Sequence, residues 1–221
     1  LRRVMELARQ GDRNLALGDQ ARRTLAGLLA TRGGDGDFEE ALRLLQQAGV
    51  DRRVEDLDER LHAVLLLGRE KPDLVRAQPL LEDLVFNRKT GMDGDHLLLA
   101  GLYAKQSQTL TGDQQRDKRD AAREQYEVVC VRPKPNPSHL IAYLSFLMDI
   151  KQWSDADRTL LRLEEVAADD VRTVALRTRW LSVQGRTSEI QPRVEAYAQR
   201  MEPTVIFTEI SYNRRSDVSL P

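Results

Sequence analysis

Residues 25–53 decide the fold class of this chain, and they read LAGLLATRGGDGDFEEALRLLQQAGVDRR. An apolar stretch leads into a Gly-Asp-Phe turn at residues 36–38, and Ala41, Leu45 and Ala48 follow it at positions i, i+4 and i+7. Residues with that spacing share one face of an α-helix. The small alanine lets a preceding helix approach closely, and the larger residue after it fills the space beyond. The stretch therefore predicts two helices that pack against each other across a short turn.

The same pattern recurs along the chain. The further triplets are Ala77-Leu81-Leu84, Ala122-Tyr126-Val129, Ala156-Leu160-Leu163 and a weaker Ile190-Val194-Tyr197. An apolar segment precedes each triplet. Equivalent positions of these segments, Leu29, Leu65, Gly101, Leu144 and Thr178, stand 36, 36, 43 and 34 residues apart. The long step indicates an insertion at residues 110–120, and a helix pair repeated at this period predicts a helical solenoid.

The copies resemble tetratricopeptide repeats (TPRs), a family whose unit of ~34 residues is a pair of antiparallel helices. The likeness rests on the turn before Ala41, on Gly101 in a first helix, and on Trp153 ahead of Ala156. It implies an all-α fold, a right-handed TPR-like α–α superhelix of about five helix pairs. The repeats are expected near residues 22–53, 58–89, 94–134, 137–168 and 171–202, within a repeat domain over 14–202.

The two ends of the chain carry separate expectations. Residues 1–13 open on an amphipathic segment without an initiator methionine, so we expect a capping helix from a truncated repeat of a longer protein. Residues 203–221 form an expected extended tail, because residues 204–212 are rich in β-branched and aromatic side chains. Such a segment tends to stick to other chains, which predicts docking on its own solenoid or self-association with a neighbouring molecule. The alternative is a chain end with no such role.

Four side chains with capping oxygens stand at expected helix starts. They are Asp73, Ser138, Ser154 and Ser188. An oxygen at this position accepts a hydrogen bond from a free N–H group of the first helical turn. We therefore expect each of these residues to begin a helix.

Composition excludes several classes of protein. The chain has 221 residues, 31% of them charged, with a formal net charge of -1. Near-neutrality argues against a general nucleic-acid binder, which needs a basic face to neutralise phosphates. No apolar run approaches the ~20 residues that span a bilayer, so no direct membrane insertion is expected. The single cysteine, Cys130, excludes an internal disulfide framework and is interpreted as a buried, inert thiol.

Motifs that carry catalytic chemistry are not found in the sequence. There is no phosphate-binding glycine loop, no nucleophile elbow and no zinc-binding histidine pair. His62, His96 and His139 fall in different repeats, each expected early in a first helix. The acidic clusters at residues 35–40 and 93–96 lack the full calcium-loop pattern and read as charge at helix N-termini. We therefore expect no cofactor, no metal and no enzymatic activity.

A stacked array of helix pairs offers a concave surface lined by first helices, on which a peptide can lie. The residues expected on this surface are apolar in the middle, with two arginines toward one end. They are Arg23, Glu59, His62, Leu66, Leu98, Leu102, Ile141, Ser145, Arg172 and Arg179. The alternative is that some of them pack between neighbouring helices. TPR proteins that grip a terminal carboxylate use polar and basic residues here, and the resemblance does not extend to that activity.

The charged insertion at residues 112–120 has two readings. It is either a ridge that touches a partner or a solvated helix extension held by neighbouring opposite charges. Because its charges are of both signs, it is a poor grip for phosphate.

The leading expectation is a non-catalytic protein–protein interaction scaffold that binds a protein or peptide segment on its concave surface. The runner-up is a regulatory or sensor segment of a larger enzyme or signalling protein. A hydrolase or transferase is the third class, and a compact pocket with convergent histidine and carboxylate side chains would favour it. The compartment stays open, with the cytoplasm favoured, and the preference for arginine over lysine suggests a bacterial origin.

Overall fold

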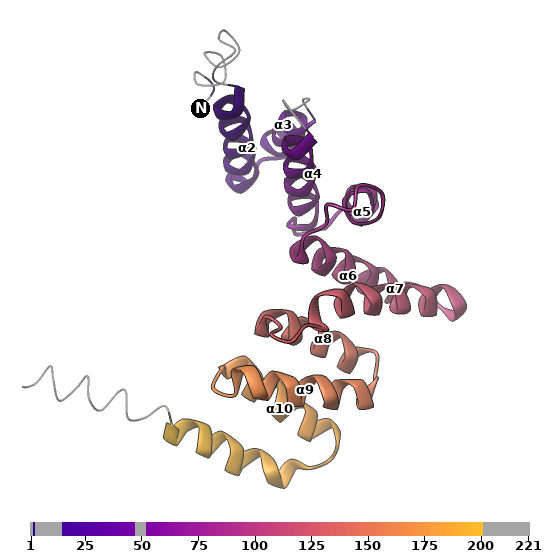
Figure 1. The fold of residues 1–221 in the computed structure, drawn as a ribbon, viewed down its shortest axis with the longest axis vertical. Helices are drawn as coiled ribbons and strands as arrows, with labels where there is room; N and C mark the ends of the chain where they lie inside the picture. The colour runs from indigo at the N-terminus through magenta and orange to yellow at the C-terminus, as the bar shows by residue number, and fades with distance from the viewer. Residues whose placement is uncertain (1, 3–14, 47–51, 201–221) are drawn as a thin grey trace, which may run out of the picture. The chain divides into compact units, whose positions relative to one another are not determined.

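A computed structural model describes residue 2 and residues 15–46 and 52–200, and every regular element among them is a helix (Figure 1). The all-α class is thereby confirmed. The expected capping helix over 1–13, apart from residue 2, and the expected tail over 203–221 lie outside the described residues. Contacts divide the chain into two compact units, one ending at Val131 and one starting at Arg132, and each is described by itself.

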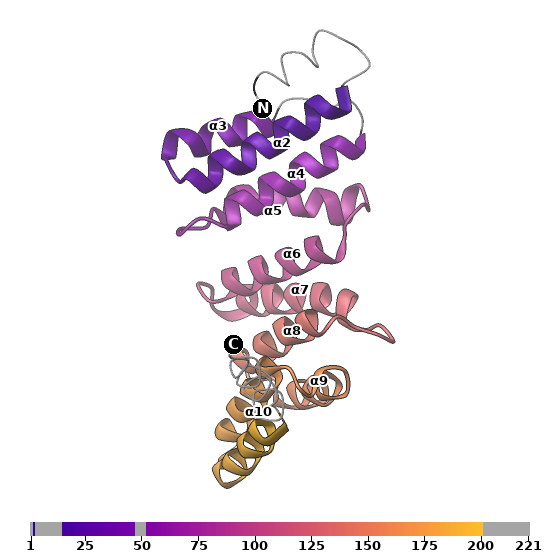
Figure 2. The same cartoon turned by 90° about the vertical axis from the view of Figure 1, so that its left-hand side faces the viewer.

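The first unit is built from three consecutive helix pairs. Its helices are α2 (Leu15–Arg32), α3 (Asp35–Leu45), α4 (Arg52–Leu67), α5 (Leu74–Glu82), α6 (Asp93–Ser107) and α7 (Gly112–Cys130), with a π-helical turn η2 (Asp83–Asn87) continuing α5. Helices α2 and α3, α4 and α5, and α6 and α7 pack as pairs (Figure 2). Successive pairs meet where α4 packs on both α2 and α3, and where α6 packs on α5. Helices α2 and α4 begin earlier than the repeats expected from residues 22 and 58.

The second unit repeats this arrangement on a smaller scale. It contains α8 (Pro137–Asp149), α9 (Trp153–Ala167), α10 (Val171–Val183), a 3-10 turn η3 (Thr187–Glu189) and a helix over residues 190–200. Helix α9 packs on α8, and α10 packs on both of them. A positive φ of 71° at Gly185 turns the chain out of α10, a backbone conformation that glycine adopts without steric cost.

The apolar triplets form the seams between helices, as the sequence indicates. Every described member of the first four triplets is buried, including the small residues Ala41, Ala77, Ala122 and Ala156. Ala48, the last member of the first triplet, lies outside the described residues. The fifth triplet does not form such a seam, because Val194 is 44% exposed. The helix over residues 190–200 therefore packs less tightly than α3, α5, α7 and α9, which carry the first four triplets.

One of the four expected capping residues is confirmed. The Asp73 carboxylate accepts a hydrogen bond from the Arg76 backbone N–H (3.0 Å) and caps α5. The other three predictions are wrong. Asn136 takes the place expected for Ser138, because Pro137 fixes the first helical residue and Asn136 accepts from the Ser138 N–H (2.9 Å). Ser154 and Ser188 lie inside helical turns.

The Asp73 cap gives a direct test of how α5 begins. We expect Asp73→Ala to lower the free energy of unfolding by about 1 kcal/mol, because one N–H of the first turn loses its acceptor. Asp73→Ser keeps a capping oxygen and should retain most of the stability. Urea denaturation followed by circular dichroism measures both variants, and equal losses in the two would contradict the capping role.

The charged insertion is a helix extension. Helix α7 begins at Gly112, where φ is 59°, and the insertion supplies its first turns. Arg116 pairs with Asp113 at 3.1 Å, and the Lys118 ammonium lies 4.5 Å from the centre of the Tyr103 ring on α6. Cys130, at the other end of α7, is buried as expected. Within the described part of the chain, no helix combines the length and the apolar character needed to cross a bilayer.

Candidate functional site

The structure places the expected partner-binding residues in environments that differ in their exposure to solvent. Leu66 and Leu102 are buried in the core of the first unit rather than open to a partner. Leu98, Ile141 and Ser145 are half-buried, and the Ser145 hydroxyl donates to the Ile141 carbonyl. Two arginines of the second unit are exposed and paired with acids of their own unit: Arg172 with Asp170 and Arg179 with Asp149.

The remaining three expected residues come together at one cleft of the first unit. Glu59 and His62 line it, and the guanidinium of Arg23 lies 3.5 Å from Asp58, which also lines it. The cleft has a volume of about 480 Å³ and lies where the end of α3, one face of α4 and the α5–η2 segment meet. We call it the α4 cleft. Its lining consists of Leu45, Gln46, Glu55, Asp58, Glu59, His62, Leu80 and Arg88.

Asp58 is held in the α4 cleft by two arginines of α2. The side chains of Asp58 and Arg22 are 3% and 4% exposed, and they form an ion pair through Asp58 Oδ2. Arg22 also donates to the Leu44 carbonyl oxygen (2.7 Å) and to Asp19 (3.1 Å). The other oxygen of Asp58, Oδ1, is buried and accepts no hydrogen bond from the described residues; the Arg23 guanidinium lies 3.5 Å from it. Burial raises the pKa of Asp58 and outweighs both arginines.

Arg88 fixes Glu59 in a similar way. The Arg88 guanidinium contacts three carboxylates, those of Asp56 (3.0 Å), Glu59 and Asp83. Burial acts to lower the Arg88 pKa, but its hydrogen bonds to Asp56 and Asp83 and the charges nearby outweigh burial and raise it. Arg88 contacts Oε1 of Glu59, whereas the buried Oε2 has no hydrogen-bond partner in the part of the chain that the structure describes. Burial raises the Glu59 pKa against the opposing charge of Arg88.

His62 brings a further unsatisfied polar atom to the α4 cleft. It lies in the middle of α4 rather than at its start, because α4 begins at Arg52. The residue is only 9% exposed, and no described residue forms a hydrogen bond with its Nε2 atom. Burial, followed by the charge of Arg76, lowers the pKa of His62, so the imidazole is neutral at neutral pH. A neutral imidazole offers one donor and one acceptor nitrogen.

The α4 cleft is suited to accept hydrogen bonds from a positively charged group. Three carboxylates face one guanidinium among its lining residues, and Leu45 and Leu80 add apolar surface. Within the described ranges, no three histidine, cysteine, aspartate or glutamate residues are grouped so as to hold a metal ion. Among the described residues, no carboxylate forms a hydrogen bond with His62. Such a hydrogen bond is the contact that orients a catalytic histidine.

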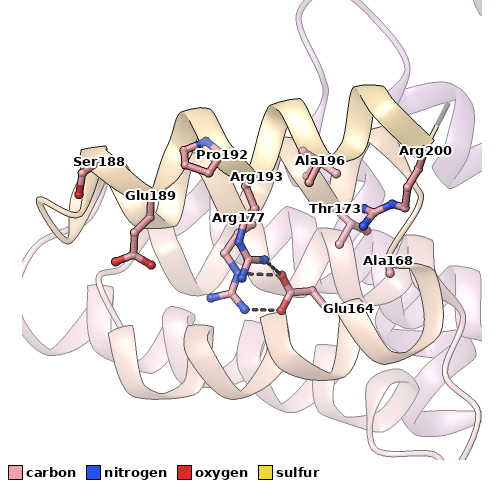
Figure 3. A pocket seen from close by; sticks show the side chains of 11 residues that line it. Glu164, Ala168, Thr173, Arg177, Ser188, Glu189, Pro192, Arg193, Ala196 and Arg200 are labelled. Atoms are coloured by element: carbon pink, nitrogen blue, oxygen red, sulfur yellow. Dashed lines mark hydrogen bonds and ion pairs between the residues drawn. The ribbon is translucent and has the colours of Figure 1, made fainter. Parts of the chain in front are cut away.

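The second unit has a cleft of its own, of about 570 Å³, between the α9–α10 pair and the helix over 190–200 (Figure 3). Glu164 accepts hydrogen bonds from Arg177 (2.8 Å) and Arg193 (2.7 Å), so the charges at its centre are already paired. The Thr173 hydroxyl is buried and has no hydrogen-bond partner in the described part of the chain. Figure 3 shows Ser188 and Arg200 at opposite ends. The other lining residues are Ala168, Val174, Glu189, Pro192 and Ala196.

The ion pairs of Glu164 predict a dependence of stability on pH. Burial acts to raise the Glu164 pKa, but the hydrogen bonds and charges of Arg177 and Arg193 outweigh burial and lower it. Because the pKa is lower in the folded state, ionised Glu164 contributes stability above the ordinary value of 4.5, and this is lost as the pH falls through the folded value. We expect Glu164→Gln to cost up to about 1 kcal/mol at neutral pH.

Thermal unfolding of the Glu164→Gln variant and the wild type across acidic pH checks this expectation. The difference between the two should shrink below pH 4.5. Glu165→Gln is the matched control, because Glu165 is the next residue of α9 and is exposed. A loss of thermal stability in Glu164→Gln that stays constant down to low pH would contradict the ion-pair explanation.

Sequence reasoning missed Asp58 and Arg88 because charged residues in an amphipathic helix normally face solvent. Here they occupy positions between helix pairs, where each charge meets an opposite one. A signal was present in the spacing: Arg22 pairs with Asp58 36 residues later, and Arg60 pairs with Asp95 35 residues later. Opposite charges one repeat apart on successive first helices indicate such pairs.

No protein-family model matches the chain, and no curated protein or solved structure gives a significant match.

Proposed function

We propose that this chain is a non-catalytic protein-interaction scaffold, resembling TPR modules, that binds a segment of a partner protein. The observation that carries the proposal is the α4 cleft at the junction of two helix pairs, where polar atoms of Glu59 and His62 find no hydrogen-bond partner among the described residues. A buried polar group without a hydrogen bond costs free energy unless a ligand or water satisfies it. A bound partner supplies the missing hydrogen bonds.

The order of helix contacts supports the TPR-like reading. In the first unit, the first helix of one pair packs on the first helix of the next (α2 on α4), and α10 packs on α8 in the second unit in the same way. The second helix of a pair also packs on the next first helix, as α3 does on α4 and α9 does on α10. A stacked array of helix pairs requires contacts between neighbours of this kind.

The mechanism we propose is recognition by a preformed surface. Arg22 and Arg88 each hold one oxygen of a cleft carboxylate, so the acceptors are oriented before a partner arrives. Binding then orders mainly the partner segment, and the scaffold itself loses little conformational entropy. The cleft contains histidine and carboxylate groups, which an enzyme of the hydrolase class would also need. Binding is favoured over catalysis because no carboxylate of the described residues forms a hydrogen bond that would orient His62.

A peptide selection tests the proposal. A displayed library of random peptides is selected on the immobilised full chain, and the enriched sequences are synthesised and titrated by calorimetry. We expect saturable binding with a shared sequence pattern. Leu80→Trp places a large side chain in the cleft and should abolish the binding, whereas Leu161→Trp, on an exposed position of α9, should not. The proposal fails if no enriched peptide binds saturably or if Leu80→Trp leaves binding unchanged.

A further inference from the structure

We infer that the α4 cleft receives the arginine side chain of the partner segment. This inference rests on the proposed function in taking the arginine to belong to a bound partner. It names the chemistry of the group that occupies the site, and it follows from the charges, the unsatisfied acceptors and the apolar surface of the cleft.

The first step concerns charge. The side chains of Glu55, Asp58 and Glu59 line the cleft opposite a single guanidinium, that of Arg88. Arg88 is shared with Asp56 and Asp83, and Asp58 is paired with Arg22 and Arg23 of α2, of which Arg22 also pairs with Asp19. Six carboxylates and three guanidinium groups therefore belong to this cluster, which leaves it net negative. A ligand of positive charge meets a net negative surface there, and an anionic ligand would meet repulsion.

The second step concerns the hydrogen bonds that are missing. An acidic surface alone is common on proteins, but here His62 is nine-tenths buried and lines the cleft, and its Nε2 atom has no partner within residues 15–46 and 52–200. Glu59 Oε2 is likewise unpartnered, while Oε1 is held by Arg88. The cleft thus presents two unpartnered polar atoms on side chains of α4 one turn apart: a carboxylate oxygen, which accepts, and an imidazole nitrogen, which accepts when the ring proton is on Nδ1. A group with several donors can satisfy both together.

The third step distinguishes arginine from lysine. A guanidinium carries five N–H donors in a fixed plane and can address separate acceptors at once, whereas an ammonium is a compact point charge that stays strongly hydrated. Leu45 and Leu80 provide apolar surface for the methylene stem of the side chain. The volume of about 480 Å³ is within the range of sites that hold small ligands.

The experiment uses the full chain labelled with nitrogen-15 and follows the imidazole signals of its three histidines by NMR. The probes are Nα-acetyl-arginine amide, Nα-acetyl-citrulline amide, which has the same shape without the charge, and Nα-acetyl-lysine amide. We expect the arginine probe to shift the His62 signals saturably and to leave those of His96 and His139 in place. The citrulline probe should give no saturable shift, and the lysine probe should bind several-fold more weakly.

Charge variants locate the effect. Glu55→Gln combined with Glu59→Gln removes two negative charges and keeps an acceptor oxygen for Arg88, and it should weaken arginine binding about tenfold. The matched control combines Glu70→Gln with Glu124→Gln, two exposed acids of the same unit outside the cleft, and should bind as the wild type does. The NMR spectra also show whether each variant is folded.

The inference is overturned if the arginine probe gives no saturable shift at His62, if citrulline binds equally, or if both charge variants bind alike. Lysine binding as tight as arginine binding overturns the assignment to a guanidinium. The two proposals fail separately. Peptides that bind through the cleft without any basic residue remove the inference and leave the proposed function standing. If the arginine probe binds at His62 but the selection yields no peptide, the inferred chemistry of the cleft is supported and the proposed function is contradicted.

Discussion

Replacing Arg22 with alanine is expected to lower the free energy of unfolding of the first unit by about 3–5 kcal/mol. The variant leaves the carboxylate of Asp58 buried without its main partner, and it also removes the donor to the Leu44 carbonyl oxygen. An uncompensated buried charge is far more costly than a lost pair on the surface, because water cannot replace the missing partner. Urea denaturation followed by far-ultraviolet circular dichroism measures the loss.

The control for this prediction is the same substitution at an exposed ion pair. Arg116 and Asp113 are 70% and 87% exposed in α7, so Arg116→Ala should change stability by no more than about 1 kcal/mol. A second variant, Arg22→Met with Asp58→Leu, replaces the pair by apolar side chains and should recover most of the stability. If Arg22→Ala costs no more than Arg116→Ala, the buried pair does not hold α2 against α4.

The buried pairs between first helices also bear on how the helix pairs find their register. Arg22 on α2 meets Asp58 on α4, and Arg60 on α4 meets Asp95 on α6 at 2.7 Å. Apolar seams tolerate a shift of one helix along another, because leucine contacts leucine at many offsets. A buried charge tolerates no such shift, since its partner must be within hydrogen-bond distance. These pairs therefore favour one stacking of the helices over its neighbours.

The helical class and the seams could be predicted from the sequence because their signals are local. The spacing of Ala156, Leu160 and Leu163 depends only on the geometry of one helix, and the structure buries all three. Asp73 was predictable as a cap for the same reason. The cap at Asn136 was missed because the serine two residues later offers a similar oxygen, and only the fixed φ of Pro137 decides between them.

The candidate site was less predictable because it depends on contacts between helix pairs. Glu59 and His62 were placed on a partner-binding surface by their repeat positions, and both line the α4 cleft. The same argument put Leu66 on that surface, where the structure buries it. Helix α4 begins before the expected repeat boundary and buries Asp56 and Asp58, so its inner face includes charged residues. A pattern of apolar residues cannot reveal such a face.

Replacing Leu160 with alanine is expected to destabilise the second unit by about 2–5 kcal/mol. Leu160 has no exposed surface and stands between Ala156 and Leu163 on the face of α9 that packs in the core. Truncation removes buried methyl groups and leaves a cavity whose walls lose their packing contacts. Both tryptophans of the chain, Trp153 and Trp180, belong to this unit, so their fluorescence during urea denaturation reports its unfolding.

The neighbouring residue provides a control that differs only in the face of the helix. Leu161 is 50% exposed on the same helix, and Leu161→Ala removes the same atoms without opening a buried cavity. We expect it to change the free energy of unfolding by less than about 1 kcal/mol, since alanine also favours the helix slightly over leucine. Because the two variants share their chemistry and their local sequence, the difference between their free energies of unfolding measures how much the buried seam contributes to stability. Similar losses at both positions would show that α9 does not pack in the assigned register, and the repeat alignment built on its alanine would have to be redrawn.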